Sequence, residues 1–224
     1  MRLYLDTADR AAAEPLLATG LFVGLTTNPT ILQRASLGVA DIPDIYRWAI
    51  DAGAREVFFQ SWGEDTATLT DRGLRLRDLG NEIVVKVVAS QAGSAACAKL
   101  ATQDVPTLLT AVYNPSQAIV AASAGATYIA PYLGKLQDAG RDATADVIAM
   151  HEILINTGSP TKVLLASIRD VSAIVTLARH GVEHFTMAPP VAEQLFADEL
   201  TEDAARTFDQ AVLETSAPGE PACG

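Results

Sequence analysis

Short apolar runs rich in β-branched residues recur along the whole chain, and each is followed by a stretch with the composition of a helix. The runs lie at residues 3–6, 22–27, 56–60, 83–88, 106–112, 127–132, 162–167 and 184–187. Their starts are 19 to 35 residues apart, which leaves room for one strand, one helix and two short loops per unit. Strands that alternate with helices form parallel sheets. The pattern predicts an α/β fold, a single (β/α)8 TIM barrel, which needs at least ~200 residues. A doubly wound open sheet with extra strands is the alternative.

Four of the helical stretches stop at a glycine, at Gly53, Gly80, Gly125 and Gly181. Glycine readily adopts the left-handed conformation that ends many helices. No linker, charge block or strict repeat interrupts the rhythm, so we expect the barrel to occupy residues 1–212. We expect residues 213–224 to be a flexible tail, because the last ten hold two prolines and two glycines without periodicity.

Composition excludes several classes of protein. The 224 residues hold 16 Lys and Arg against 27 Asp and Glu, and no basic cluster, which argues against nucleic-acid binding. Cys97 and Cys223 have no metal-site spacing, so we expect neither a disulfide framework nor a metal. No glycine-rich nucleotide motif is present. No apolar run approaches the ~18 residues of a membrane span and no apolar leader is seen, so we expect a cytoplasmic protein without membrane contact.

Polar side chains gather where the predicted strands end. In a TIM barrel the catalytic groups lie at the carboxyl ends of the strands, whereas inward-facing residues deeper in the barrel are mostly apolar. Only the run at 184–187 ends without an obviously reactive side chain. The other seven runs supply Asp6, Thr26 with Thr27 and Asn28, Gln60, Lys86, Thr110, Tyr132 and Ser167.

A lysine interrupts the apolar run at 83–88, which reads IVVKVV. A parallel strand covered on both faces should carry no charge there. Burial lowers the pKa of a lysine, and a neutral amine can attack a carbonyl and form a Schiff base. Lys86 is therefore the leading catalytic candidate. The alternative is an edge strand on which Lys86 reaches water along its own stem and blocks aggregation.

Helix capping is the alternative for three of the other positions. Asp6 is a good N-cap residue, and Asn28 followed by proline is a standard helix start. Ser167 and Asp170 have the spacing of a capping arrangement. The functional interpretation of this last segment is an anion site, because a helix N-terminus after the seventh strand, with Arg169 beside it, often holds phosphate in such barrels.

Tyr132 follows Ala-Pro at the end of the sixth run and has two interpretations. Its ring could close the mouth of the barrel, or its hydroxyl could donate a proton to a bound water or a lysine-derived imine. Thr110 and Gln60 have the same ambiguity. The residues alone leave these alternatives open.

Six segments of the chain resemble the transaldolase superfamily, and within it the short branch of fructose-6-phosphate aldolases and transaldolases. The resemblance covers residues 2 to about 210. The segments are LDTA at 5–8, TTNPTI at 26–31, IVVK at 83–86, TAVY at 110–113, GATYIAPY at 125–132 and ASIR at 166–169. The resemblance implies a TIM barrel of class I (Schiff-base) aldolase architecture, which needs no metal or organic cofactor.

The resemblance also implies roles for particular residues. Lys86 would form the Schiff base with a ketose, and Asp6 would contact a substrate hydroxyl near the bond that breaks. The water that shuttles protons would be held by Thr110, Gln60 and Tyr132. Thr26 would be a further substrate-binding residue, and Asn28 would orient the dihydroxyacetone part. The phosphate would be bound by Ser167, Arg169 and Lys135, with Lys135 in the loop after the sixth strand.

Two positions favour one branch of the family over the other. This chain has Gln60 and Tyr132 and so resembles the aldolases, because the transaldolases tend to carry Glu and Phe at these two positions. The implied function is cleavage or formation of fructose 6-phosphate from dihydroxyacetone and glyceraldehyde 3-phosphate, or a related reaction. The alternative is a transaldolase that passes the dihydroxyacetone unit between sugar phosphates such as sedoheptulose 7-phosphate and glyceraldehyde 3-phosphate. A sugar-phosphate-binding barrel without turnover is a third hypothesis.

Some residues depart from the aldolase pattern. Val88 replaces the usual proline, and Lys135 replaces an arginine that binds phosphate, so phosphate affinity could be lower or the preferred substrate could be unphosphorylated. Residues 114–117 and Gly134 look more like the transaldolases. Short members of the family form pentamer-based rings, often decamers, so the resemblance implies a homo-oligomer.

Overall fold

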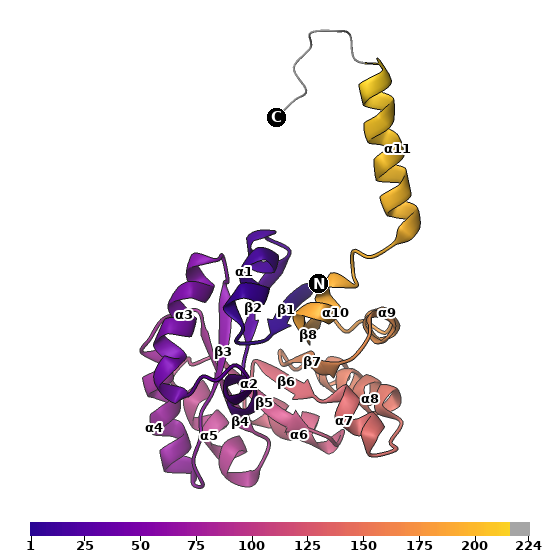
Figure 1. Cartoon of the computed structure of the whole chain (residues 1–224). Coiled ribbons are helices and arrows are strands. Elements are labelled where there is room, and N and C mark those ends of the chain that lie inside the picture. Colours follow the sequence, from indigo (N-terminus) through magenta and orange to yellow (C-terminus); the bar gives the residue numbers. More distant parts are fainter. Residues whose placement is uncertain (216–224) are drawn as a thin grey trace.

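The computed structural model describes residues 1–215. Within these residues, parallel strands close into a barrel in chain order, with β8 pairing back onto β1 (Figure 1). The predicted (β/α)8 barrel is therefore confirmed, and the open-sheet alternative is wrong. Closure also removes every sheet edge, so no strand of this barrel is an edge strand.

The strands match the apolar runs closely. They are β1 Arg2–Asp6, β2 Phe22–Thr26, β3 Glu56–Gln60, β4 Ile83–Val88, β5 Thr107–Val112, β6 Tyr128–Pro131, β7 Lys162–Ile168 and β8 His184–Met187. The helical segments are α1 Arg10–Ala18, α2 Pro29–Arg34, a 3-10 turn Val39–Asp41, α3 Ile42–Asp51, α4 Thr66–Arg77, α5 Gln91–Ala101, α6 Ser116–Ser123, α7 Leu133–Asp138, α8 Ala143–Asn156, α9 Val171–Ala178, α10 Pro189–Glu193 and α11 Glu199–Thr215.

Alternation along the strands builds two apolar layers. Side chains that point outward pack against the surrounding helices, for example Val85 and Val87 of β4. Side chains that point inward form a second cluster in the barrel interior, with Tyr4, Phe58 and Tyr128 in ring contact. Because the period of a strand is two residues, Val84 and Lys86 share the inward face of β4. The interior is therefore packed below and polar at its carboxyl end.

Glycine ends three of the four helical stretches as predicted. Gly53, Gly125 and Gly181 have φ angles of 99°, 69° and 89°, the left-handed region that penalises a Cβ. Gly80 differs, because it is not among the residues with positive φ. A Cβ at Gly80 would lie 1.7 Å from the hydroxyl of Tyr46, so this glycine serves close packing instead.

The last helix, α11, extends away from the barrel instead of packing on it (Figure 1). None of its residues is buried. The expected domain boundary at residue 212 falls inside this helix, because the helical pattern continues to Thr215. The part of the predicted tail at 216–224 lies outside the described residues. In residues 1–215 no helix has both the length and the apolar character needed to cross a membrane.

Candidate active site

Lys86 lies on the inner face of the barrel near the carboxyl end of β4. Its strand pairs with β3 on one side and β5 on the other, so the edge-strand interpretation is wrong. The side chain is only 4% exposed, and its Nζ donates a 2.6 Å hydrogen bond to the backbone carbonyl of Thr27. Burial lowers the pKa of Lys86 to about 8, although the charge of Asp6 works in the opposite direction. With that pKa, roughly a tenth of the amine is uncharged at pH 7, far more than for an exposed lysine.

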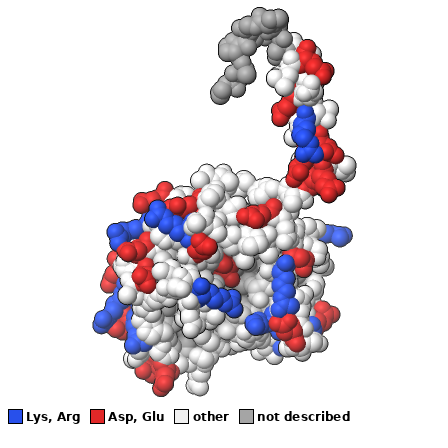
Figure 2. All heavy atoms as spheres, in the orientation of Figure 1, with Lys and Arg blue, Asp and Glu red and all other residues white. Residues whose placement is uncertain are grey.

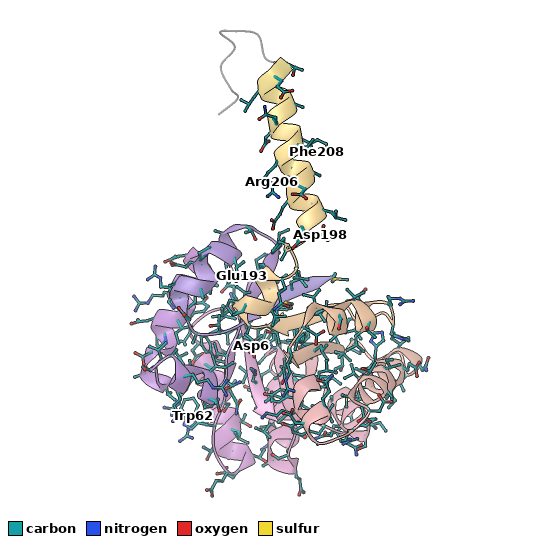
Figure 3. The ribbon with its side chains drawn as sticks, turned by 45° about the vertical axis from the view of Figure 1, so that its right-hand side comes forward. Asp6, Trp62, Glu193, Asp198, Arg206 and Phe208 are labelled. Atoms are coloured by element: carbon teal, nitrogen blue, oxygen red, sulfur yellow. The ribbon has the colours of Figure 1, made fainter. Side chains whose placement is uncertain are left out.

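Asp6 ends β1 inside the same polar region and lies in the middle of the barrel body in Figure 3. Its Oδ1 accepts a 2.6 Å hydrogen bond from Thr26 Oγ1. Burial raises the pKa of Asp6, against the opposing effects of Lys86, Thr26 and Arg34. The predicted capping alternative is wrong for this residue, because Asp9 caps α1 by accepting from the backbone N–H of Ala12.

Thr110 and Tyr132 form a pair of hydroxyls at the ends of β5 and β6. Thr110 Oγ1 and Tyr132 Oη are 2.7 Å apart. Burial raises the pKa of Tyr132, and the charge of Asp6 adds to this shift. The ring of Tyr113 packs edge-on against Tyr132 at 5.8 Å, so the ring also helps to close the mouth. The raised pKa keeps the hydroxyl of Tyr132 protonated at neutral pH.

Asn28 and Gln60 lie on the opposite side of Lys86. Asn28 caps α2, since its Oδ1 accepts a 2.9 Å bond from the N–H of Ile31. Gln60 is the register partner of Lys86 on β3. Together with Trp62 they line a largely apolar cavity of about 270 Å³. The capping role of Asn28 leaves its amide NH₂ available for a ligand.

The residues predicted to bind phosphate line a second cavity, of about 230 Å³, that also reaches Asp6 and Tyr132. Lys135, Ser167 and Arg169 all contribute to its wall. Lys135 lies in the short helix α7 and not in a loop. Asp170 caps α9, so Ser167 is not the capping residue there. The structure thus brings together the three residues that were predicted to bind an anion.

Local backbone geometry brings these groups together. Ser167 has a φ of 59°, a left-handed conformation that costs energy in a residue with a Cβ. A Cβ at Gly134 would lie 2.8 Å from the carbonyl oxygen of Ser167 and 2.9 Å from Nε of Arg169. The glycine therefore allows α7 to approach the end of β7. Arg169 also donates two hydrogen bonds, of 2.7 and 2.6 Å, to the carboxylate of Asp138.

Two residues of the site are missed by the sequence analysis. Thr186 on β8 is buried and its hydroxyl lies 2.6 Å from that of Thr26, so the eighth strand does contribute a polar group. The alternation of β8 could have indicated it, because Phe185 and Met187 belong to the outward-facing cluster. Arg34 ends α2 and lines the same cavity as Lys135. No pattern within its own segment signals that position.

No metal centre is formed by the described residues, in which no group of three His, Cys, Asp or Glu side chains comes together. His180 and His184 are four residues apart with Glu183 between them. They do not share a helix, because His180 follows α9 and His184 begins β8. The cluster at the mouth instead consists of an amine, carboxylates, hydroxyls and cations, a set that suits polar carbonyl substrates.

Comparisons with known proteins show the family to which the chain belongs. Residues 3–218 match the family described as "Transaldolase/Fructose-6-phosphate aldolase". A "Probable transaldolase" of Coprothermobacter proteolyticus is 34% identical over 99% of this chain and 100% of the relative. One of Caulobacter vibrioides is 32% identical over 93% of this chain and 94% of the relative.

Solved structures support the fold alone. A mutant of flavocytochrome b2 superposes with a TM-score of 0.58 at 12% identity over 84% of this chain. A mandelate oxidase mutant superposes with a TM-score of 0.59 at 16% identity, again over 84% of this chain. This chain spans only 56% and 64% of those two chains. From the family match over nearly its whole length, the chain belongs to the transaldolase/fructose-6-phosphate aldolase family.

Proposed function

We propose that this protein is a class I aldolase that cleaves or forms fructose 6-phosphate, or a related sugar, through a Schiff base on Lys86. The observation that carries the proposal is the buried amine of Lys86, with a pKa lowered to about 8, facing Asp6 across the barrel mouth. A neutral amine is the nucleophile that imine formation requires. The family match supports an enzyme of this chemistry.

In the cleavage direction, the amine of Lys86 adds to the ketone carbon. Uptake of one proton from solvent and loss of water give a protonated imine, and the final hydrolysis returns that proton. The carboxylate of Asp6 takes the proton from the hydroxyl next to the bond that breaks. The electron pair of that carbon–carbon bond passes to the imine, which gives an enamine, and the aldehyde leaves. Tyr132, paired with Thr110, protonates the enamine carbon through a water, and the proton on Asp6 returns to Tyr132. Water then releases dihydroxyacetone and free Lys86.

The other residues of the site hold the substrate. Asn28 orients the dihydroxyacetone part with its free amide NH₂, and Gln60 helps to hold the shuttling water. Thr26 fixes Asp6 through its 2.6 Å hydrogen bond. The phosphate lies in the cavity of Ser167, Arg169 and Lys135.

Release of free dihydroxyacetone is supported by Gln60 and Tyr132, because a tyrosine hydroxyl can protonate the enamine and end the reaction there. The second candidate is a transaldolase, in which the enamine attacks another sugar phosphate. The relatives named as probable transaldolases, at 32–34% identity, favour this candidate. The two candidates share every step up to the enamine.

Incubation with fructose 6-phosphate alone separates the candidates. We expect dihydroxyacetone at catalytic rates, whereas product that forms only after erythrose 4-phosphate is added would identify a transaldolase. Borohydride trapping followed by peptide mapping should place the adduct on Lys86. Lys99→Ala, which removes an exposed lysine of α5, is the matched control and should leave the adduct intact. Saturable sugar-phosphate binding without any adduct would refute Schiff-base chemistry.

We also propose that the chain forms a homo-oligomer, a pentamer or decamer, as the resemblance implies. The support is α11, which presents Leu200, Phe208 and Leu213 at 80%, 68% and 70% exposure. Figure 3 shows Phe208 on this helix well outside the barrel. Light scattering measures the mass directly. Phe208→Glu should reduce the assembly, and Gln210→Glu, a change on the same helix, should not. A monomer in the unaltered protein would contradict the proposal.

A further inference from the structure

Arg34 lies between two hollows at the mouth of the barrel. On one side is the cavity of about 230 Å³ that holds Lys135, Ser167 and Arg169. On the other is a hollow of about 590 Å³ lined by residues that follow β1 and by the end of α2. Arg34 and Asp6 line both hollows. In Figure 2, Lys and Arg side chains lie near the middle of the face in view as well as along its rim.

The neighbouring cations are already engaged. Arg169 directs a guanidinium nitrogen at both oxygens of Asp138, and Lys135 is close enough to Asp138 to help lower its pKa. Arg10, on the wall of the larger hollow, is paired with Glu14 at 2.6 Å. Among residues 1–215, Arg34 has no ion pair within 4 Å and makes no side-chain hydrogen bond. Its charge acts on Asp6, whose pKa it lowers.

The chemistry of Arg34 differs from that of Lys135. A guanidinium offers a planar fork that matches a phosphate with two parallel hydrogen bonds, whereas an ammonium acts as a point charge. Asp138 partly neutralises the two cations on the Ser167 side. Two arginines line this cavity, and Arg169 is paired with Asp138. Within residues 1–215, the guanidinium of Arg34, at the end of α2, is not paired with a carboxylate.

The geometry points to Arg34 as the residue that selects phosphorylated substrates, by binding the substrate phosphate from the wall opposite Ser167. This inference rests on the proposed function, because it concerns the aldehyde or ketose phosphate of that reaction. Arg34, at the end of α2, would then be a specificity-determining residue in a phosphate site whose other residues lie in α7 and at the end of β7. Lys135 and Arg169 then share the phosphate with Arg34.

The test compares two aldehydes that differ only in the phosphate. With dihydroxyacetone as donor, Arg34→Gln should raise the KM for glyceraldehyde 3-phosphate about tenfold or more, the usual loss for a charge-assisted pair. The kinetics with unphosphorylated glyceraldehyde should stay within about twofold. Arg34→Lys should fall between the two. Arg10→Gln, on the same hollow but ion-paired, is the matched control and should change neither KM.

Two results would overturn the inference. One is an equal loss of activity on both aldehydes, which would mean that Arg34 acts through Asp6, whose pKa it lowers; the other is an unchanged KM for glyceraldehyde 3-phosphate. A second experiment needs no turnover. The binding of inorganic phosphate, measured by calorimetry, should weaken in Arg34→Gln and not in Arg10→Gln. Failure of the proposed function is distinguishable, because the unaltered protein would then give no borohydride adduct while phosphate binding still reports on Arg34.

Discussion

The two ends of the barrel interior each hold a charged side chain, the partly buried Glu56 and the buried Lys86, and their surroundings differ. At the amino end, Glu56 accepts hydrogen bonds from Tyr4 at 2.5 Å and Tyr128 at 3.1 and 3.2 Å, and it pairs with Arg2 at 3.4 Å. At the carboxyl end, the amine of Lys86 donates one hydrogen bond within residues 1–215, to the carbonyl of Thr27.

The difference shows what makes one end reactive. Glu56 is held by donors that stay protonated, because burial and the carboxylate raise the pKa of Tyr4 and burial raises that of Tyr128. These hydrogen bonds stabilise Glu56 at the amino end of the barrel. Lys86 is buried, and desolvation disfavours its charged form, so its neutral form is accessible. The reactive lysine at the mouth, which is the carboxyl end of the barrel, therefore lowers the stability of the fold. The amino end, called the closed end below, contributes stability.

Replacing Lys86 should have the largest effect on activity. Lys86→Met should lower turnover at least ~10³-fold, because no other group can form the imine. The same change should raise the free energy of unfolding at pH 7 by up to about 3 kcal/mol, since it removes a buried ammonium whose pKa falls from 10.5 to about 8. Stopped-assay kinetics and urea unfolding measure the two effects.

The pH dependence fixes the sign of that stability gain. The lowered pKa of Lys86 means that the folded protein bears the full cost of the ammonium below pH 8. The cost fades as pH rises from 8 to 10.5, where the unfolded lysine also loses its proton. The advantage of Lys86→Met should shrink over the same range. A gain that grew with pH would contradict a depressed pKa.

Tyr132→Phe should have the next largest effect. It removes the hydroxyl that lies 2.7 Å from Thr110 Oγ1, and general acid catalysis of this kind contributes roughly 10²-fold or more. We expect turnover to fall by about that factor while the borohydride adduct on Lys86 still forms. Tyr113→Phe keeps the edge-on ring and loses only an outer hydroxyl, so it should leave turnover within about twofold. A normal rate in Tyr132→Phe would remove this residue from the proton path.

Glu56→Gln tests the closed end and should affect stability only. The amide keeps one acceptor oxygen but loses charge, so the bonds from Tyr4 and Tyr128 weaken and Arg2 loses its partner. We expect a loss of about 1–2 kcal/mol in the free energy of unfolding. The kcat should be unchanged. A large fall in kcat without a fall in stability would show that the two ends are coupled.

The strands and the direction of their side chains are predictable from the sequence, because both depend on the local alternation of apolar residues. Each strand appears as an apolar run, and two-residue alternation is enough to place Lys86 among inward-facing neighbours once the barrel closes. Closure then brings Asp6, Thr110 and Tyr132 to one mouth from separate strands. These positions follow from fold and periodicity together, because every strand of a TIM barrel delivers its carboxyl end to the same face.

Long-range charge geometry is not predictable in this way. Asp138 engages Arg169 across 31 residues, and Arg34 approaches the mouth on a helix that crosses it. The closed-end cluster around Glu56 joins side chains 52 and 72 residues apart. The amphipathic pattern of α11 resembles that of a helix packed on a barrel, so its exposure could not be read from the pattern alone.

The smallest expected effect is a shift in the pH at which Lys86 becomes nucleophilic. The rate of adduct trapping with dihydroxyacetone should rise with pH through about 8, as the amine loses its proton. The charge of Asp6 raises the pKa of Lys86, so Asp6→Asn should move the midpoint to lower pH. Glu56→Gln removes a carboxylate from the other end of the same barrel and should leave the midpoint in place. If both changes moved the midpoint equally, the total charge of the interior, and not the carboxylate at the mouth, would set the reactivity of Lys86.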